Sequence, residues 1–106
     1  MIVRTWSGWT HRDDENAYEQ YMREVALPGY TAIDGNQGVL MLKRPVGDRT
    51  EFLMVSLWDS IQSVEAFAGS EPAKAVFYPE DERYLVARDE RVRHYEVVFQ
   101  VEEATP

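Results

Sequence analysis

Residues 51–60 read Glu-Phe-Leu-Met-Val-Ser-Leu-Trp-Asp-Ser, an apolar and β-prone run that ends in a polar pair. An extended chain places alternate side chains on opposite faces, here Phe52, Met54, Ser56 and Trp58 against Leu53, Val55 and Leu57. Large apolar side chains occur in both sets, so we expect both faces of this strand to be covered. The stretch predicts a strand buried on two sides that runs into a helix capped by Asp59-Ser60.

A second β-prone run, residues 38–43, precedes this strand. The residues between the two runs, 44–50, contain the Pro and Gly that are typical of a turn. The two runs therefore predict a β-hairpin.

Residues 2–10 are rich in β-branched and aromatic side chains and predict the first strand. Asp13 or Asp14 can cap the helix that follows, in which apolar side chains recur every three or four positions. We expect Pro28-Gly29 to end this helix.

The C-terminal half of the chain completes the order of elements. We expect a helix over residues 61–68 ended by Gly69, a short helical turn over 71–76, an irregular or short helical connection over 77–85, and a last strand over 92–101. Residues 102–106 are expected to be a frayed tail.

This order, β-α-β-β-α-β, predicts a ferredoxin-like α+β fold with an antiparallel sheet and both helices on one face. A chain of 106 residues fits one domain, residues 1–106. The helices leave the second face of the sheet bare. A second protomer packed there would cover the apolar side chains, so we expect a homodimer with a dimeric α+β barrel.

The composition argues against several classes of function. A net charge of −8 opposes binding to nucleic acid or to anionic membranes. The chain has no Cys and no long apolar run, which argues against thiolate chemistry and a membrane span and favours a cytoplasmic protein. His11 and His94 are the only imidazoles, and their spacing predicts no metal site.

Candidate site residues follow from the position of each side chain in these elements. Trp58, at the end of its strand, can line a cavity between sheet and helices and donate its N–H to a ligand; packing in the core is the alternative. Met54 shares its face, and at most one of Trp6 and Trp9 can do so. Phe67 lies on the apolar stripe of the following helix.

His94 and Glu96 share a face of the last strand and could act as a general base pair, or form an ordinary surface pair. Tyr78, Tyr84 and Arg88 follow the second helix in a region that can aim side chains at a ligand, with a solvated loop as the alternative.

Leu57-Trp58-Asp59-Ser60 followed by Glu65-Ala66-Phe67 resembles the antibiotic biosynthesis monooxygenase superfamily of dimeric α+β barrels, over nearly the whole chain. The resemblance implies a monooxygenase that needs no cofactor or metal and oxidises a quinol-like or polyphenol-like aromatic molecule with dioxygen. By this analogy Trp58, His94 and Tyr78 are catalytic candidates, and the substrate-binding candidates are Trp6, Met54, Phe67, Tyr84 and Arg88.

Two other functions remain open under the same resemblance. Haem-degrading relatives use an Asn on the first strand and an iron-binding His on the second helix, and this chain has neither. A small-molecule-binding or regulatory dimer without catalysis is the remaining alternative. A pocket lined by apolar side chains alone, with His94 and Arg88 turned to solvent, would favour that alternative.

Overall fold

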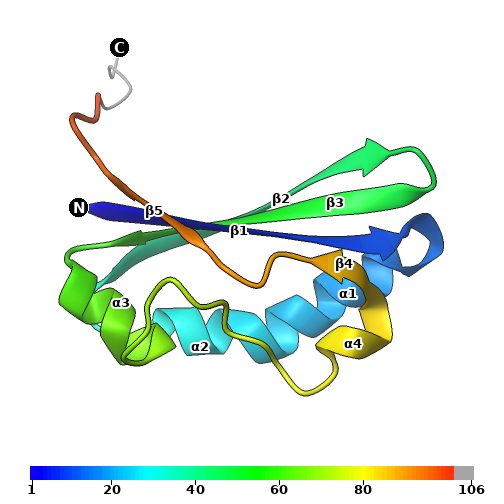
Figure 1. Ribbon diagram of the computed structural model, residues 1–106, viewed down its shortest axis with the longest axis horizontal. Coiled ribbons are helices and arrows are strands. Elements are labelled where there is room, and N and C mark those ends of the chain that lie inside the picture. Colours follow the sequence, from blue (N-terminus) through cyan, green and yellow to red (C-terminus); the bar gives the residue numbers. More distant parts are fainter. Residues whose placement is uncertain (102–106) are drawn as a thin grey trace, which may run out of the picture.

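A computed structural model describes residues 1–101 and shows one sheet with the helices gathered on one of its faces (Figure 1). The strands are β1 (Ile2–His11), β2 (Asn36–Val46), β3 (Arg49–Trp58), β4 (Leu85–Arg88) and β5 (Arg93–Glu96). The helical segments are η1 (Arg12–Asp14), α1 (Glu15–Tyr21), η2 (Met22–Ala26), α2 (Leu27–Thr31), α3 (Ile61–Ala68) and α4 (Asp81–Tyr84). Within residues 1–101, no helix has the length and apolar character needed to cross a membrane.

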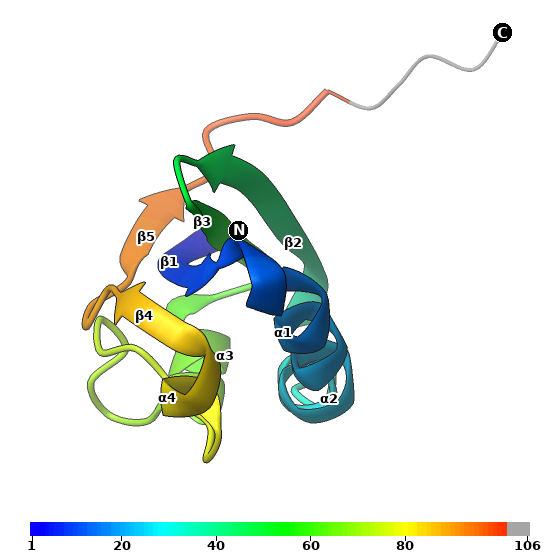
Figure 2. The ribbon, with the colours of Figure 1, turned by 90° about the vertical axis from the view of Figure 1, so that its right-hand side faces the viewer.

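All strand pairings are antiparallel, in the spatial order β2-β3-β1-β4, and β5 also pairs with β1. β4 and β5 together occupy the place of one outer strand, so the sheet has the ferredoxin-like arrangement that the sequence predicts. The end-on view shows the sheet curving over the helices, while its opposite face is uncovered in the single chain (Figure 2). The α+β class and the antiparallel sheet are confirmed.

The alternation predicted for β3 is present. On the helical face, Phe52, Met54, Ser56 and Trp58 are all buried. The side chains between them are only partly buried, because no element of the same chain lies over that face. Burial on two sides is therefore incomplete in the single chain.

The first helix does not end at Pro28-Gly29, and that prediction was wrong. The chain passes through a π-helical turn, η2, and continues as α2 with Pro28 and Gly29 inside it. Pro28 lies in the first turn of α2, where a missing N–H is tolerated. The sequence predicts that the helix ends at Pro28, but the wider π-helical turn before Pro28 lets the helix continue.

The hairpin is confirmed, but its strands are longer than predicted. β2 runs through Pro45 to Val46, and β3 already begins at Arg49. Pro45 is compatible with β2 because β2 is an edge strand, where one side needs no N–H donor. Gly47 has φ +61°, a left-handed conformation that allows the tight reversal with Asp48.

The second predicted helix has its expected ends. The Ser60 hydroxyl accepts a hydrogen bond from the Ser63 N–H at 3.2 Å, which caps α3. Gly69 follows α3 with φ +90° and its N–H donates to the Glu65 carbonyl.

Two predictions for the C-terminal half were wrong. Residues 71–76 contain a turn and an isolated bridge from Lys74 to Arg91, with no helix. The last strand is only Arg93–Glu96, and β4 was not predicted. The exposed fractions of Val98 and Phe99 are 91% and 82%, so the β-prone end of the chain has no neighbouring strand to pair with. The tail, 102–106, lies outside the described residues.

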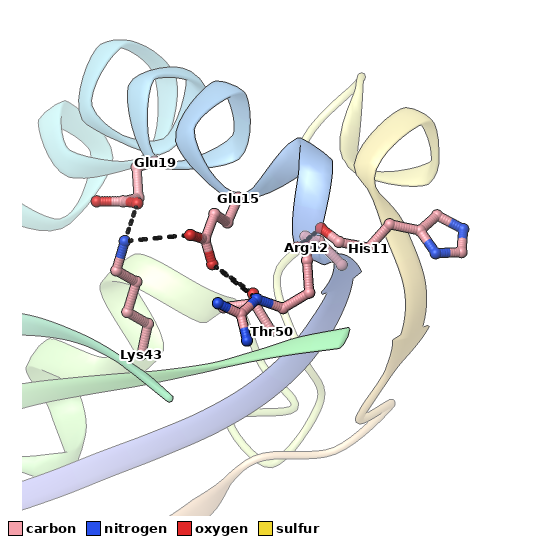
Figure 3. Close-up of polar contacts among 7 residues, drawn as sticks. His11, Arg12, Glu15, Glu19, Lys43 and Thr50 are labelled. Carbon is pink, nitrogen blue, oxygen red and sulfur yellow. Dashed lines mark hydrogen bonds and ion pairs between the residues drawn. The ribbon is translucent and has the colours of Figure 1, made fainter. Parts of the chain in front are cut away.

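Polar contacts hold α1 on the hairpin end of the sheet (Figure 3). The Thr50 hydroxyl donates to Glu15 at 2.5 Å, and the Lys43 ammonium donates to Glu19 at 2.8 Å. The His11 ring points away from these carboxylates in the same view. Among residues 1–101 no three His, Asp or Glu side chains gather as metal ligands.

Candidate functional site

A row of polar side chains crosses the helical face of the sheet. The register pairs Ser56 of β3 with Arg4 of β1, and Arg4 with His94 of β5. The next inward positions on either side of this row are Trp58, paired with Ile2, and Met54, paired with Trp6. Two candidates from the sequence, Trp58 and His94, thereby lie on the same face of the sheet, on either side of β1, which carries Arg4.

Trp58 forms one wall of the site. Its indole is fully buried, with its ring centroid 5.3 Å from that of Phe67 and 6.4 Å from that of Tyr30. The indole N–H donates to the Ser56 hydroxyl at 2.9 Å, so it is already bonded within the chain. Trp58 can therefore shape an aromatic wall, but the donor expected for a ligand is occupied.

Arg4 places a positive charge against this wall. The residue is 2% exposed, and its guanidinium carbon lies 5.3 Å from the centroid of the Phe67 ring. Nη2 donates to the Lys74 carbonyl at 3.2 Å, while Nε is buried without a hydrogen-bond partner. No carboxylate of residues 1–101 forms an ion pair with Arg4.

The energetic cost of this arrangement is large. Moving a charged group out of water costs several kcal/mol. A cation–π contact offsets about 0.5–2 kcal/mol of that cost, and the single hydrogen bond from Nη2 leaves the buried Nε–H without an acceptor. Burial lowers the pKa of Arg4, whereas the nearby Tyr30 and Tyr78 phenols act in the opposite direction. The charge lacks the counter-ion that burial normally requires.

Two more polar atoms near Arg4 are buried without partners, the Tyr78 hydroxyl and Nε2 of His94. Burial raises the pKa of Tyr78, so the phenol stays protonated and can donate. Burial, followed by the charge of Arg4, lowers the pKa of His94, so the imidazole stays neutral at neutral pH. No hydrogen bond or ion pair to Glu96 is present, so the predicted His94–Glu96 pair does not form in the described chain.

Trp6 and Met54 lie beside this group, and both are buried. Trp6 is the inward member of the two tryptophans of β1, as the alternation predicts, and Trp9 is partly buried on the other face. The Trp6 N–H donates to the Asp89 carbonyl at 2.8 Å. Trp6 therefore anchors the link between β4 and β5, as well as contributing apolar surface.

Tyr84 and Arg88 are not part of the group around Arg4. The Tyr84 ring packs against Tyr21 and Tyr18, with centroids 5.4 and 6.0 Å away. The Arg88 guanidinium lies 3.9 Å from the Phe77 ring centroid and forms ion pairs with two exposed carboxylates. The structure thus divides the predicted site residues into a group around Trp58 and two outlying residues.

The connection between α3 and α4 covers the group around Arg4. It supplies the Lys74 carbonyl and Tyr78, whose N–H donates to the Asp81 carboxylate at 2.6 Å. Its ribbon passes along the helical layer without regular structure (Figure 1). Five cavities around residues 1–101 are lined by residues other than Trp58. Trp58 is fully buried, and the rings that pack against it, Tyr30 and Phe67, come from α2 and α3, so a ligand ring reaches Trp58 only if these neighbours shift.

Arg4 was missed as a site residue in the sequence, as were Tyr30 and Ser56. Arg4 has the same parity as Trp6 in β1, so alternation alone places it on the inward face. A charge at an inward strand position was the signal that could have identified it. Tyr30 carried no such signal, because the predicted helix ended before it.

These features define a ferredoxin-like α+β domain with a mixed aromatic and polar site enclosed on the helical face of its sheet. The family model described as antibiotic biosynthesis monooxygenase matches residues 1–77. The chain belongs to this family. No curated protein sequence matches it.

Solved structures share the fold at low sequence identity. A Bacillus cereus protein described as an antibiotic biosynthesis monooxygenase is 14% identical, with a TM-score of 0.68 over 96% of this chain and 97% of that one. The haem degrader MhuD of Mycobacterium tuberculosis, solved with two haems in its active site, is 18% identical, with a TM-score of 0.55 over 96% and 100%. A NIPSNAP domain protein of Burkholderia xenovorans is 14% identical, with a TM-score of 0.58 over 96% and 100%.

Proposed function

We propose that this protein is a cofactor-independent monooxygenase that oxidises a small quinol-like or polyphenol-like aromatic molecule beside Trp58. The observation that carries the proposal is the cluster of three buried polar groups without partners, on Arg4, Tyr78 and His94, against an aromatic wall. Buried polar groups are normally paired, and perturbed groups gathered at one place favour a functional site. Family membership supports the same class of reaction.

The reaction consumes one dioxygen for each substrate molecule. A hydroxylated ring loses its phenolic proton and one ring hydrogen, one oxygen atom enters the ring as a carbonyl, and the other leaves as water. The substrate supplies the electrons, so no external reductant is required. An electron-rich ring is needed because its anion must reduce dioxygen.

Each polar group has a role in this proposal. Neutral His94 can accept the phenolic proton, since its buried Nε2 has no other partner. Protonated Tyr78 can donate a hydrogen bond to the developing carbonyl oxygen. Trp58 and Phe67 would hold the ring by stacking, which makes them binding rather than proton-transfer residues.

Oxygen uptake tests this function directly. The purified protein, without added cofactor, is mixed with a panel of dihydroxynaphthalenes and anthrone, and uptake is compared with the rate without protein. We expect turnover that falls at least about tenfold in His94→Gln and stays unchanged in His11→Gln, which removes the other imidazole. Uptake no faster than the reaction without protein across the panel would refute catalysis and leave the binding-protein alternative.

We also propose that the protein works as a homodimer, as predicted from the sequence. Leu40 and Leu42 of β2 lie beside Val55 and Leu53 of β3 on the face that no helix covers. Their exposed fractions are 54% and 44%, and Tyr95 on β5 is 52% exposed beside Val3. A second sheet over this face would cover the patch and give the β-prone residues 98–101 a neighbour.

Haem degradation is a second candidate, favoured by the neutral, unpartnered Nε2 of His94, which is the form that binds iron. Against it, α3 carries no His, and His94 comes from a strand beside a positive charge. Titration with hemin decides between the two candidates. A saturable Soret shift that His94→Gln abolishes would favour haem, and the absence of such a shift would remove this candidate.

A further inference from the structure

We infer that the ligand of the site beside Trp58 carries a carboxylate, and that Arg4 binds it. This inference rests on the ligand site proposed above and names the class of molecule that fits it. Arg4 is the one positive side chain buried among the aromatic residues of the helical face in the described chain. Its Nε–H is closed to solvent and has no acceptor.

The groups around Arg4 leave its charge without a counter-ion. Its neighbours are the Phe67 ring, the Lys74 carbonyl, the Tyr30 and Tyr78 phenols, and His94 on the adjacent strand. The phenols are protonated because burial raises their pKa, and the imidazole is neutral, so none of them is negative at neutral pH. Asp81 is a buried carboxylate that acts on both phenols, but it accepts from the Tyr78 N–H and forms no ion pair with Arg4. A ligand anion is therefore the partner that Arg4 lacks.

A carboxylate fits better than an ionised phenol. The guanidinium is charged over the whole working range of pH, so its partner should be ionised in the free ligand as well. Carboxylic acids ionise near pH 4 and simple phenols near pH 10. The planar fork of N–H donors also matches the two oxygens of a carboxylate. The inferred ligand is therefore an aromatic carboxylic acid whose ring lies against Trp58 and Phe67.

The binding preference must arise from contact with Arg4 rather than from long-range attraction. The net charge of −8 repels anions at a distance. Arg93 offers a matched control, because it is exposed, lies next to His94 in β5, and its loss changes the net charge by the same amount as the loss of Arg4. Arg4→Lys keeps the charge but removes the planar fork.

The test compares 1-hydroxy-2-naphthoate with its neutral amide, 1-hydroxy-2-naphthamide, by calorimetry and by quenching of tryptophan fluorescence. We expect the wild-type protein and Arg93→Met to bind the carboxylate about 10- to 100-fold more tightly than the amide. Arg4→Met should bind both equally, and Arg4→Lys should keep part of the preference. Circular dichroism shows whether each variant is folded; if Arg4→Met is not, the comparison of wild type with Arg4→Lys decides.

Equal affinity of the wild-type protein for the two probes, or binding of neither, would overturn the inference. A preference that survives in Arg4→Met or is undiminished in Arg4→Lys would overturn it as well. Oxygen uptake separates this outcome from failure of the proposed function. If neutral quinols are turned over but the carboxylate is not preferred, the role of Arg4 is refuted and the oxygenase proposal stands. If the carboxylate is preferred but no oxygen is taken up, the role of Arg4 stands and the oxygenase proposal is refuted.

Discussion

The indole N–H of Trp58 donates to the hydroxyl of Ser56, two residues earlier in the same strand, at 2.9 Å. Both side chains are buried on the helical face. The bond fixes the orientation of the indole against Phe67 and Tyr30, and it prevents a buried donor from being left without an acceptor. Trp58 thus owes its orientation in part to a serine that makes no aromatic contact.

Replacing Ser56 by Ala should lower the free energy of unfolding by about 1–3 kcal/mol, because it leaves the Trp58 N–H buried without a partner. Urea denaturation measures the change, and Ser70→Ala, at an exposed position, is the control and should alter stability by less than about 0.5 kcal/mol. A loss no larger in Ser56→Ala than in Ser70→Ala would mean that this hydrogen bond does not contribute to stability.

Gly29 and Gly69 should respond oppositely to replacement by Ala. Gly29 is helical, and an added Cβ would meet the Tyr78 hydroxyl at 3.4 Å, an ordinary contact, so Gly29→Ala should raise stability by about 0.5–1 kcal/mol. Gly69 has φ +90°, so Gly69→Ala should lower stability by about 1 kcal/mol or more. Thermal unfolding of both variants checks the signs, and destabilisation by Gly29→Ala would show that Tyr78 is more tightly held than described.

The pKa of His94, lowered by burial and then by Arg4, makes stability depend on pH. Below about pH 6.5 the unfolded chain takes up a proton on His94 more readily than the folded chain does. The stability that the folded state gains from holding this imidazole neutral is therefore fully present above that pH and is lost as the pH falls below it. We expect the free energy of unfolding of the wild type to fall more between pH 8 and pH 5.5 than that of His94→Gln. His11→Gln is the control: its urea unfolding curves should match those of the wild type at both pH values.

The uncovered face of the sheet should control the oligomeric state. Light scattering at micromolar concentration should give twice 12.3 kDa for the wild type. Leu42→Glu places a charge in the proposed interface and should give a monomer, whereas Gln37→Glu introduces the same charge at an exposed position of β2 and should leave the dimer intact. A wild-type particle of 12.3 kDa would contradict the dimer.

Much of the fold could be predicted from the sequence because its signals are local. The alternation in β3, the Ser60 cap, Gly69 and the turn at Gly47 each depend on residues close to one another in the chain. The errors at Pro28 and in the last strand have a common cause. A π-helical turn can absorb a proline, and a β-prone segment needs a neighbouring strand, and neither condition is visible in local composition.

The candidate site was predicted in part. Six of the predicted residues lie on or beside the helical face: Trp6, Met54, Trp58, Phe67, Tyr78 and His94. The other two lie elsewhere. Tyr84 packs with Tyr18 and Tyr21, and Arg88 forms ion pairs with exposed carboxylates. Arg4 was missed because strand periodicity gives the face of a residue but not whether a counter-ion lies opposite it.

The sequence by itself determined which side chains share a face of each strand and helix, and hence the fold and the position of Trp58 at the end of β3. Only the tertiary structure decided what those side chains meet: that the Trp58 donor is occupied by Ser56, that Arg4 lies over Phe67 without a carboxylate, and that Tyr78 comes from a distant segment to lie near Arg4. The physical reason is that periodicity follows from backbone geometry within a few residues, whereas burial, charge pairing and pKa depend on groups far apart in the chain.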